Sequence, residues 1–153
     1  AGLEPTDEEY WIGKPSARSF DDCCNEFWML TSYVVKGLCR NEILFAIDHL
    51  RLMRDELLRM LSWQVGIDYG FDFGVGKNYK FLPKYLPEAT WERVRSTYQN
   101  DSCEALWEAL FLCQELFRQS ASRLAERFGY AYPEYDARMT QYARRFEAAY
   151  RGR

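Results

Sequence analysis

Four polar side chains that could do chemistry recur at helical spacing between residues 17 and 38. Asp22, Glu26, Tyr33 and Lys36 follow one another at intervals of four, seven and three residues, so a helix would carry them on one side. Carboxylates can hold an amine or accept a hydroxyl proton, and a lysine can steady a phosphate. The competing interpretation is a solvated helix surface with exposed ion pairs.

A second group of carboxylates recurs further along the chain. Asp101, Glu104, Glu108 and Glu115 share a helical stripe, and Trp107 lies among them. Carboxylates and aromatic faces together bind organic cations, through charge-assisted hydrogen bonds and stacking. We expect Glu104, Trp107 and Glu108 to contribute to a ligand site, with an ordinary acidic helix surface as the alternative.

The segment from Gly74 to Lys80 combines glycines with lysines and is typical of a phosphate-binding loop in composition. Glycines allow backbone N–H groups to converge on an anion, and Lys77 and Lys80 would add positive charge. The spacing of a Walker loop is absent. The alternative is a simple turn between helices, anchored by Tyr79 and Phe81.

The hydrophobic pattern predicts an all-α fold: a single helical bundle of five to six helices, with a Gly-rich loop between the second and third helical segments. Residues 1–15 read as an extended lead-in or interdomain tether, and residues 16–153 as the helical domain. Ser16 is the expected N-cap of the first helix, and Gly129 is the expected C-terminal stop of the long helix. The expected helices cover 17–38, 42–69 (as one helix or a kinked pair), 87–98, 102–128 and 133–150.

Apolar residues cover nearly every side of the helix expected after residue 42. We therefore expect its first half, residues 43–53, to be central and buried. Within it, Asp48 and Arg51 are expected to form a buried ion pair, and His49 to be a core histidine.

Composition excludes several kinds of protein. With 153 residues, 17% of them aromatic, the chain can bury a sizeable core. The net charge of −3 gives no basic field for nucleic acid, and no apolar run is long enough to span a membrane. One histidine and five scattered cysteines predict neither a metal site nor a disulfide framework, and they favour a reducing cytoplasm.

Several long strings make the sequence similar to a known family. KPSARSFDDCCNEFWMLTSYVVKGL, EILFAIDHL, ELLRMLSW, VGKNYKFL and WEALFLCQELFR, followed by YAYPEYD, resemble the streptomycin (aminoglycoside 6-) adenylyltransferases from about Lys14 to Tyr150. The resemblance implies an enzyme that transfers AMP from ATP to a streptomycin hydroxyl. It also implies an N-terminal nucleotidyltransferase domain that holds ATP and Mg²⁺ with a Gly-Ser loop and an Asp-x-Asp pair.

The match covers only the helical C-terminal half of that family. This sequence has no Gly-Ser dipeptide and no Asp-x-Asp, so we expect no activity from this chain alone and no metal site within it. The resemblance implies Glu26 as a possible base or substrate ligand, although the base could equally come from the other domain. It also implies phosphate contacts by Lys36, Lys77 and Lys80.

The expected partners are an aminoglycoside, ATP and the nucleotidyltransferase domain, with neither nucleic acid nor membrane. This hypothesis predicts that the first helix and the long helix share one concave acidic face, with an exposed apolar patch elsewhere for domain docking. The alternative is a non-enzymatic helical module that is derived from the family and serves for interaction or for dimerisation with a second copy.

Overall fold

The computed structural model describes residues 11–153, which form six α-helices and one short 3-10 helix at Lys77–Tyr79. The first ten residues of the predicted lead-in lie outside the described residues. The all-α prediction is confirmed. The α-helices are α1 (Ala17–Cys39), α2 (Ile43–Tyr69), α3 (Leu82–Tyr85), α4 (Glu88–Ser96), α5 (Cys103–Phe128) and α6 (Tyr135–Arg151).

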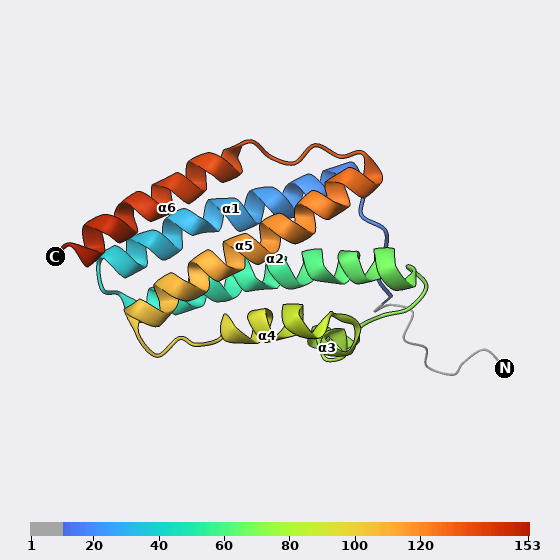
Figure 1. Cartoon of the computed structure of the whole chain (residues 1–153), viewed down its shortest axis with the longest axis horizontal. Coiled ribbons are helices and arrows are strands. Elements are labelled where there is room, and N and C mark those ends of the chain that lie inside the picture. Colours follow the sequence, from blue (N-terminus) through green and yellow to red (C-terminus); the bar gives the residue numbers. More distant parts are fainter. Residues whose placement is uncertain (1–10) are drawn as a thin grey trace.

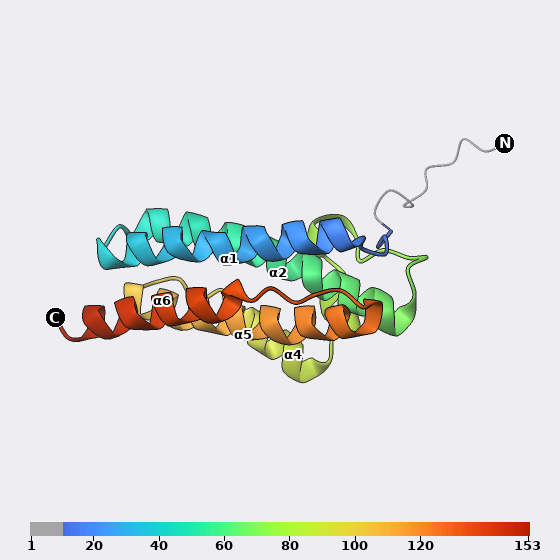
Figure 2. The same cartoon turned by 90° about the horizontal axis from the view of Figure 1, so that it is seen from above.

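The long helices run along the long axis of the molecule and form two layers (Figure 1). In the view from above, α1 and α2 make one layer, while α4, α5 and α6 make the other (Figure 2). The three-residue connection between α1 and α2 makes them antiparallel neighbours. The two layers therefore give the molecule two separate outer surfaces.

The core lies between these layers and is rich in aromatic rings. Phe27 of α1 and Phe117 of α5 stack with ring centroids 3.9 Å apart and planes inclined by 4°. Trp28 packs edge-on against both rings. The apolar stripe of the first helix is fully inside, as its spacing predicts: its members are Phe20, Cys23, Phe27, Leu30, Val34 and Leu38.

Local signals place most helix ends correctly. The Ser16 hydroxyl oxygen accepts a hydrogen bond from the Ser19 backbone N–H, and the Ser19 hydroxyl oxygen accepts one from the Ser16 backbone N–H, which is a capping box. Gly129 ends α5 in the left-handed conformation at φ 73°. The last helix begins at Tyr135, two residues after the proline expected to open it.

The segment between α2 and α3 folds back onto the bundle. Ile12 donates a backbone hydrogen bond to Phe73 (2.8 Å), and Trp11 forms an isolated antiparallel bridge with Gly74. The ring of Phe71 lies against Gly66 so closely that a Cβ there would stand 2.2 Å from the ring. These contacts hold the segment from Gly74 to Lys80, which we call the Gly-Lys segment, beside the N-terminus of α1.

The first half of α2 differs from its prediction. The helix is continuous, but Leu44 is 79% exposed and Phe45 is 39% exposed, so the expected burial of residues 43–53 is wrong in part. The inward positions of this half are Ala46, Leu50 and Met53. Residue type alone does not decide which side of a helix meets a partner, and here two apolar residues occupy the solvent side.

Two polar residues of the same helix are also more exposed than predicted. Asp48 and Arg51 do form an ion pair at 3.2 Å, but more than half of each side chain is exposed. His49 is half-buried at the surface, where its Nδ1 lies 2.9 Å from the Phe45 carbonyl oxygen.

All five cysteines are free thiols, as expected, and Cys23, Cys24 and Cys113 are buried. Among the helices of residues 11–153, none combines the length and apolar character needed to cross a membrane.

Candidate functional site

The predicted stripe of α1 lies on the outer surface of the α1–α2 layer. Asp22, Glu26, Tyr33 and Lys36 are all exposed, and none belongs to the core. We call this surface the α1–α2 outer face: it comprises these four side chains and Met29 on α1, together with Leu44, Phe45 and His49 on α2.

The far end of this face is aromatic and apolar. The ring of His49 stacks on that of Tyr33, with centroids 5.3 Å apart and planes inclined by 17°, and it also packs against Phe45 at 4.1 Å. Met29 and Leu44 are 50% and 79% exposed. We name Met29, Tyr33, Leu44 and Phe45 the apolar patch. Such a group on a surface marks an interaction site more often than isolated apolar residues do.

The near end of the face opens into a cavity of about 640 Å³. Its lining carries three cations, Lys14, Arg59 and Lys77, drawn from the lead-in, α2 and the Gly-Lys segment. Ser19 of α1 and the Trp63 ring also line it. We call it the cation pocket. The Lys14 ammonium lies 4.8 Å from the centroid of the Phe128 ring, outside this lining, so Arg59 and Lys77 are the cations that suit an anion such as a phosphate.

Arg59 is fixed in this pocket by its neighbours. Its Nη1 lies 3.5 Å from Glu56 on the same helix, and the Tyr79 hydroxyl is close to its guanidinium. Burial raises the pKa of Tyr79, and the Arg59 guanidinium partly offsets this effect. Tyr79 is therefore a neutral hydroxyl that positions a guanidinium, which is half-exposed to a ligand.

Distances along α1 decide which predicted residues can act together. Ser19, at the cation pocket, and Glu26 are seven residues apart on one side of the helix, or about 10 Å at 1.5 Å per residue. Lys36 is seventeen residues from Ser19, or about 25 Å. The structure therefore does not bring Lys36 and Lys77 to one triphosphate. Lys36 instead sits 5.5 Å from the Tyr33 ring centroid.

Lys80 also points elsewhere. Its ammonium lies 5.0 Å from the centroid of the Phe81 ring, which Lys84 approaches at 4.8 Å, and it is not among the residues that line the cation pocket. Of the predicted phosphate ligands, only Lys77 is in this pocket.

The candidates on α5 lie on the opposite layer. Glu104 forms an ion pair with Arg151 of α6, and Trp107 is fully buried in the core. Glu108 is exposed and lines a groove whose other wall is α6. The prediction that the first helix and the long helix share one acidic face is therefore wrong, because the two carboxylate stripes belong to different layers (Figure 2).

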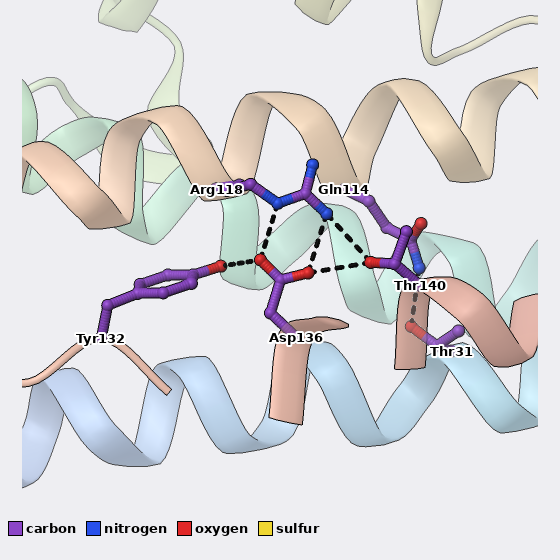
Figure 3. A network of polar contacts seen from close by, with 6 residues as sticks. All are labelled: Thr31, Gln114, Arg118, Tyr132, Asp136 and Thr140. Carbon is purple, nitrogen blue, oxygen red and sulfur yellow. Dashed lines mark hydrogen bonds and ion pairs between the residues drawn. The ribbon is translucent and has the colours of Figure 1, made fainter. Parts of the chain in front are cut away.

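A polar network near the start of α6 went unrecognised in the sequence (Figure 3). Arg118 of α5 donates two hydrogen bonds to Asp136, at 2.6 and 2.7 Å, and a third to Thr140. The Tyr132 hydroxyl donates to Asp136 at 2.6 Å. Burial opposes ionisation of Asp136, but the hydrogen bonds from Arg118, Tyr132 and Thr140 outweigh it and lower the pKa of this carboxyl.

The sequence contains a signal for some of these polar residues and none for the others. Arg59 interrupts an apolar run, and a charge at such a position indicates a polar neighbour or a cavity. Arg118 and Asp136 are eighteen residues apart on different helices. No local pattern predicts that contact.

The described residues contain no group of three or more His, Cys, Asp or Glu side chains placed to hold a metal ion. The cation pocket, in contrast, has the charge that phosphates require.

Comparison with known proteins gives consistent matches. Residues 2–146 match the family model described as streptomycin adenylyltransferase. The chain is 54% identical over 147 residues to an aminoglycoside 6-adenylyltransferase of Campylobacter jejuni, covering 95% of this chain and 51% of the relative. It is 51% identical over 141 residues to the Bacillus subtilis protein of the same name, covering 92% of this chain and 50% of the relative.

A solved structure agrees with these matches. A crystal structure of an aminoglycoside 6-adenyltransferase from Bacillus subtilis superposes with a TM-score of 0.84 at 47% identity, covering 96% of this chain and 56% of that one. The chain spans about half the length of the relatives it matches.

Proposed function

The chain belongs to the streptomycin adenylyltransferase family, and from that premise we propose that it is the substrate-binding, cleft-closing half of an aminoglycoside 6-adenylyltransferase. The reaction of the whole enzyme would transfer AMP from ATP to a streptomycin hydroxyl and so confer antibiotic resistance. The observation that carries this proposal is the order of groups along the α1–α2 outer face: a cation pocket, then carboxylates, then aromatic rings.

The carboxylates of α1 suit the cationic drug. Glu26 is exposed in the middle of the face, one turn from Asp22, and neither is buried by another helix. A guanidinium or amine of the aminoglycoside would pair with these groups through charge-assisted hydrogen bonds. Glu26 would act as the substrate ligand or as the base that accepts the hydroxyl proton, and Tyr33 would pack against the sugar rings.

The cation pocket suits the phosphates of ATP, which supplies the adenylyl group. The sequence predicts Lys77 as a phosphate ligand, and the structure adds Arg59 to the same pocket. The separation of about 10 Å along α1 between this pocket and Glu26 leaves room for a nucleotide and a drug side by side. Magnesium would be held by the nucleotidyltransferase domain, so this chain alone would not transfer AMP.

The rest of the enzyme is the proposed occupant of the apolar patch. The relatives are about twice as long as this chain, and a second half of similar size would pack on one surface of it. The apolar patch includes Tyr33, which is also a proposed drug contact, and Met29, which lies three residues after Glu26 on α1. A domain seated there would close the substrate between the two halves.

Isothermal titration calorimetry with streptomycin tests the proposal on the chain as it stands. We expect binding that weakens as salt is raised, because carboxylate–guanidinium pairs are screened. An uncharged sugar of similar size serves as the control ligand and should give no heat of binding. Absence of streptomycin binding to the folded chain would remove the α1–α2 outer face as a sufficient drug site.

A second candidate function is a helical module that dimerises, and the exposed apolar patch favours it specifically. In that case two copies would bury Leu44 and Phe45 against each other. Light scattering distinguishes the two: dimers that dissociate in a Leu44→Glu variant support the module, whereas a monomer at all concentrations supports the enzyme half.

A further inference from the structure

The α5–α6 groove lies on the opposite layer from the proposed drug face and carries its own set of ligand-binding groups. It has a volume of about 480 Å³. Three carboxylates line it, Glu108 and Glu115 from α5 and Glu147 from α6, together with the Phe111 ring. Glu115 is paired with Arg93 at 3.1 Å, and Glu147 with Arg144 and Arg151. Among the described residues, Glu108 has no ion-pair partner.

Gln114 gives an independent indication that a donor belongs in this groove. Its side chain lines the groove and is only 1% exposed. The amide nitrogen donates to the Thr31 hydroxyl at 3.3 Å, but the amide oxygen has no hydrogen-bond partner among the described residues. Figure 3 shows this oxygen turned away from Thr31. A buried acceptor without a partner is costly and rare, so a ligand donor reaching it would be favoured.

Arg144 shows which chemistry the groove accepts. Its guanidinium carbon lies 3.5 Å from the centroid of the Phe111 ring, and its Nη1 is 3.3 Å from Glu147. A planar cation therefore already stacks on this aromatic surface beside a carboxylate. The Arg144 side chain is 58% exposed, so it can leave the ring when another cation takes its place.

We propose that the α5–α6 groove is a second binding site, for an organic cation bearing a guanidinium group. The ligand cation stacks on Phe111, pairs with Glu108 and donates a hydrogen bond to the buried oxygen of Gln114. The Arg144 guanidinium competes with the ligand cation for the Phe111 ring. The site is independent of the proposed enzymatic function, because the groove has no α1 residue in its lining.

NMR titration of the chain with methylguanidinium tests the site, with methylammonium as a second probe. We expect the Gln114 side-chain amide signals to move and saturate, and methylguanidinium to bind more tightly because only it presents a flat face to Phe111. The Glu108→Gln variant should weaken binding about tenfold, since a charge-assisted bond is lost. Glu126→Gln, which removes an exposed carboxylate of the same helix outside the groove, should leave binding unchanged.

Two more variants separate this site from a general attraction to acidic surface. Arg144→Ala should tighten binding several-fold by removing the competitor from the Phe111 ring. Gln114→Met removes the unpaired oxygen and should weaken methylguanidinium binding while the chain stays folded. Equal weakening by Glu108→Gln and Glu126→Gln, no saturable shift at Gln114, or weaker binding by Arg144→Ala would each overturn the proposal.

Discussion

Arg118 of α5 and Asp136 at the start of α6 form a two-pronged ion pair, with Nε–Oδ2 and Nη2–Oδ1 distances of 2.6 and 2.7 Å. The Asp136 side chain is only 7% exposed, whereas that of Arg118 is 38% exposed. The pair joins the last helix to the bundle at the place where the α5–α6 connection ends. Figure 3 shows that Tyr132 and Thr140 complete the set of donors around the carboxylate.

Asp136→Asn should therefore destabilise the chain by about 2 kcal/mol, because Arg118 loses its charge partner at a partly buried position. Urea unfolding followed by circular dichroism measures the change. Asp48→Asn is the matched control, since it breaks an exposed ion pair, and it should cost at most about 0.5 kcal/mol. Equal effects of the two substitutions would contradict a structural role for Asp136.

The same pair predicts how stability depends on pH. The pKa of Asp136 is lower in the folded chain than in the unfolded chain, so its contribution is fully present above the unfolded value, about 3.9, and is lost as pH falls through the folded value. The difference in unfolding free energy between the wild type and Asp136→Asn should thus stay constant within about 0.5 kcal/mol from pH 5 to 7. It should shrink below about pH 4. A difference that grows at low pH would contradict this assignment.

Phe117→Ala should lower the free energy of unfolding by about 3–5 kcal/mol, because it leaves a cavity between the two layers where the ring stacks on Phe27. The control is Leu44→Ala, at a position that is 79% exposed, which should change stability by less than about 0.5 kcal/mol. Chemical unfolding of both variants makes the comparison. A small effect of Phe117→Ala would mean that the aromatic stack is not the centre of the core.

Cysteine alkylation should follow burial. Burial raises the pKa of Cys24 to about 12 and that of Cys113 to about 11, and it also raises the pKa of Cys23. The reactive thiolate is therefore scarce at these three positions. Iodoacetamide at pH 8, followed by peptide mass mapping, should modify the partly exposed Cys39 and Cys103 first. Early labelling of Cys113 would show that α5 opens in the native chain.

Periodicity predicted most of the fold because helices and their ends are encoded locally. Interactions between residues close in sequence determine the apolar stripe from Phe20 to Leu38, the Ser16 cap and the Gly129 stop. The exposure of Leu44 and Phe45 could not be predicted from local periodicity. Which side of an apolar helix meets its partner depends on tertiary packing.

The site was predictable only in part for the same reason. The exposed side chains of α1 follow from helical spacing, and Lys77 follows from the composition of the Gly-Lys segment. The addition of Arg59 to the cation pocket depends on the lead-in and the Gly-Lys segment lying beside α2. The residue type of Trp107 favours a ligand site, but its position on α5 directs the side chain toward the core, where it is buried.

The cation pocket makes its own prediction. Arg59→Met should weaken the binding of inorganic pyrophosphate, because a cation of the pocket lining is lost while the aliphatic volume is kept. Arg95→Met removes an exposed cation of α4 that only pairs with Glu92, and it should not change binding. Tryptophan fluorescence reports on occupancy, because Trp11 and Trp63 both line the pocket. An equal loss in both variants would indicate nonspecific charge attraction.

The most direct test of the central claim is streptomycin affinity in the Glu26→Gln variant, measured by calorimetry beside the wild type and Glu126→Gln. Both substitutions remove one exposed carboxylate, but only Glu26 lies on the α1–α2 outer face. Loss of a charge-assisted contact predicts affinity about tenfold weaker in Glu26→Gln and unchanged affinity in Glu126→Gln. Unchanged affinity in Glu26→Gln would contradict the assignment of this face to the drug.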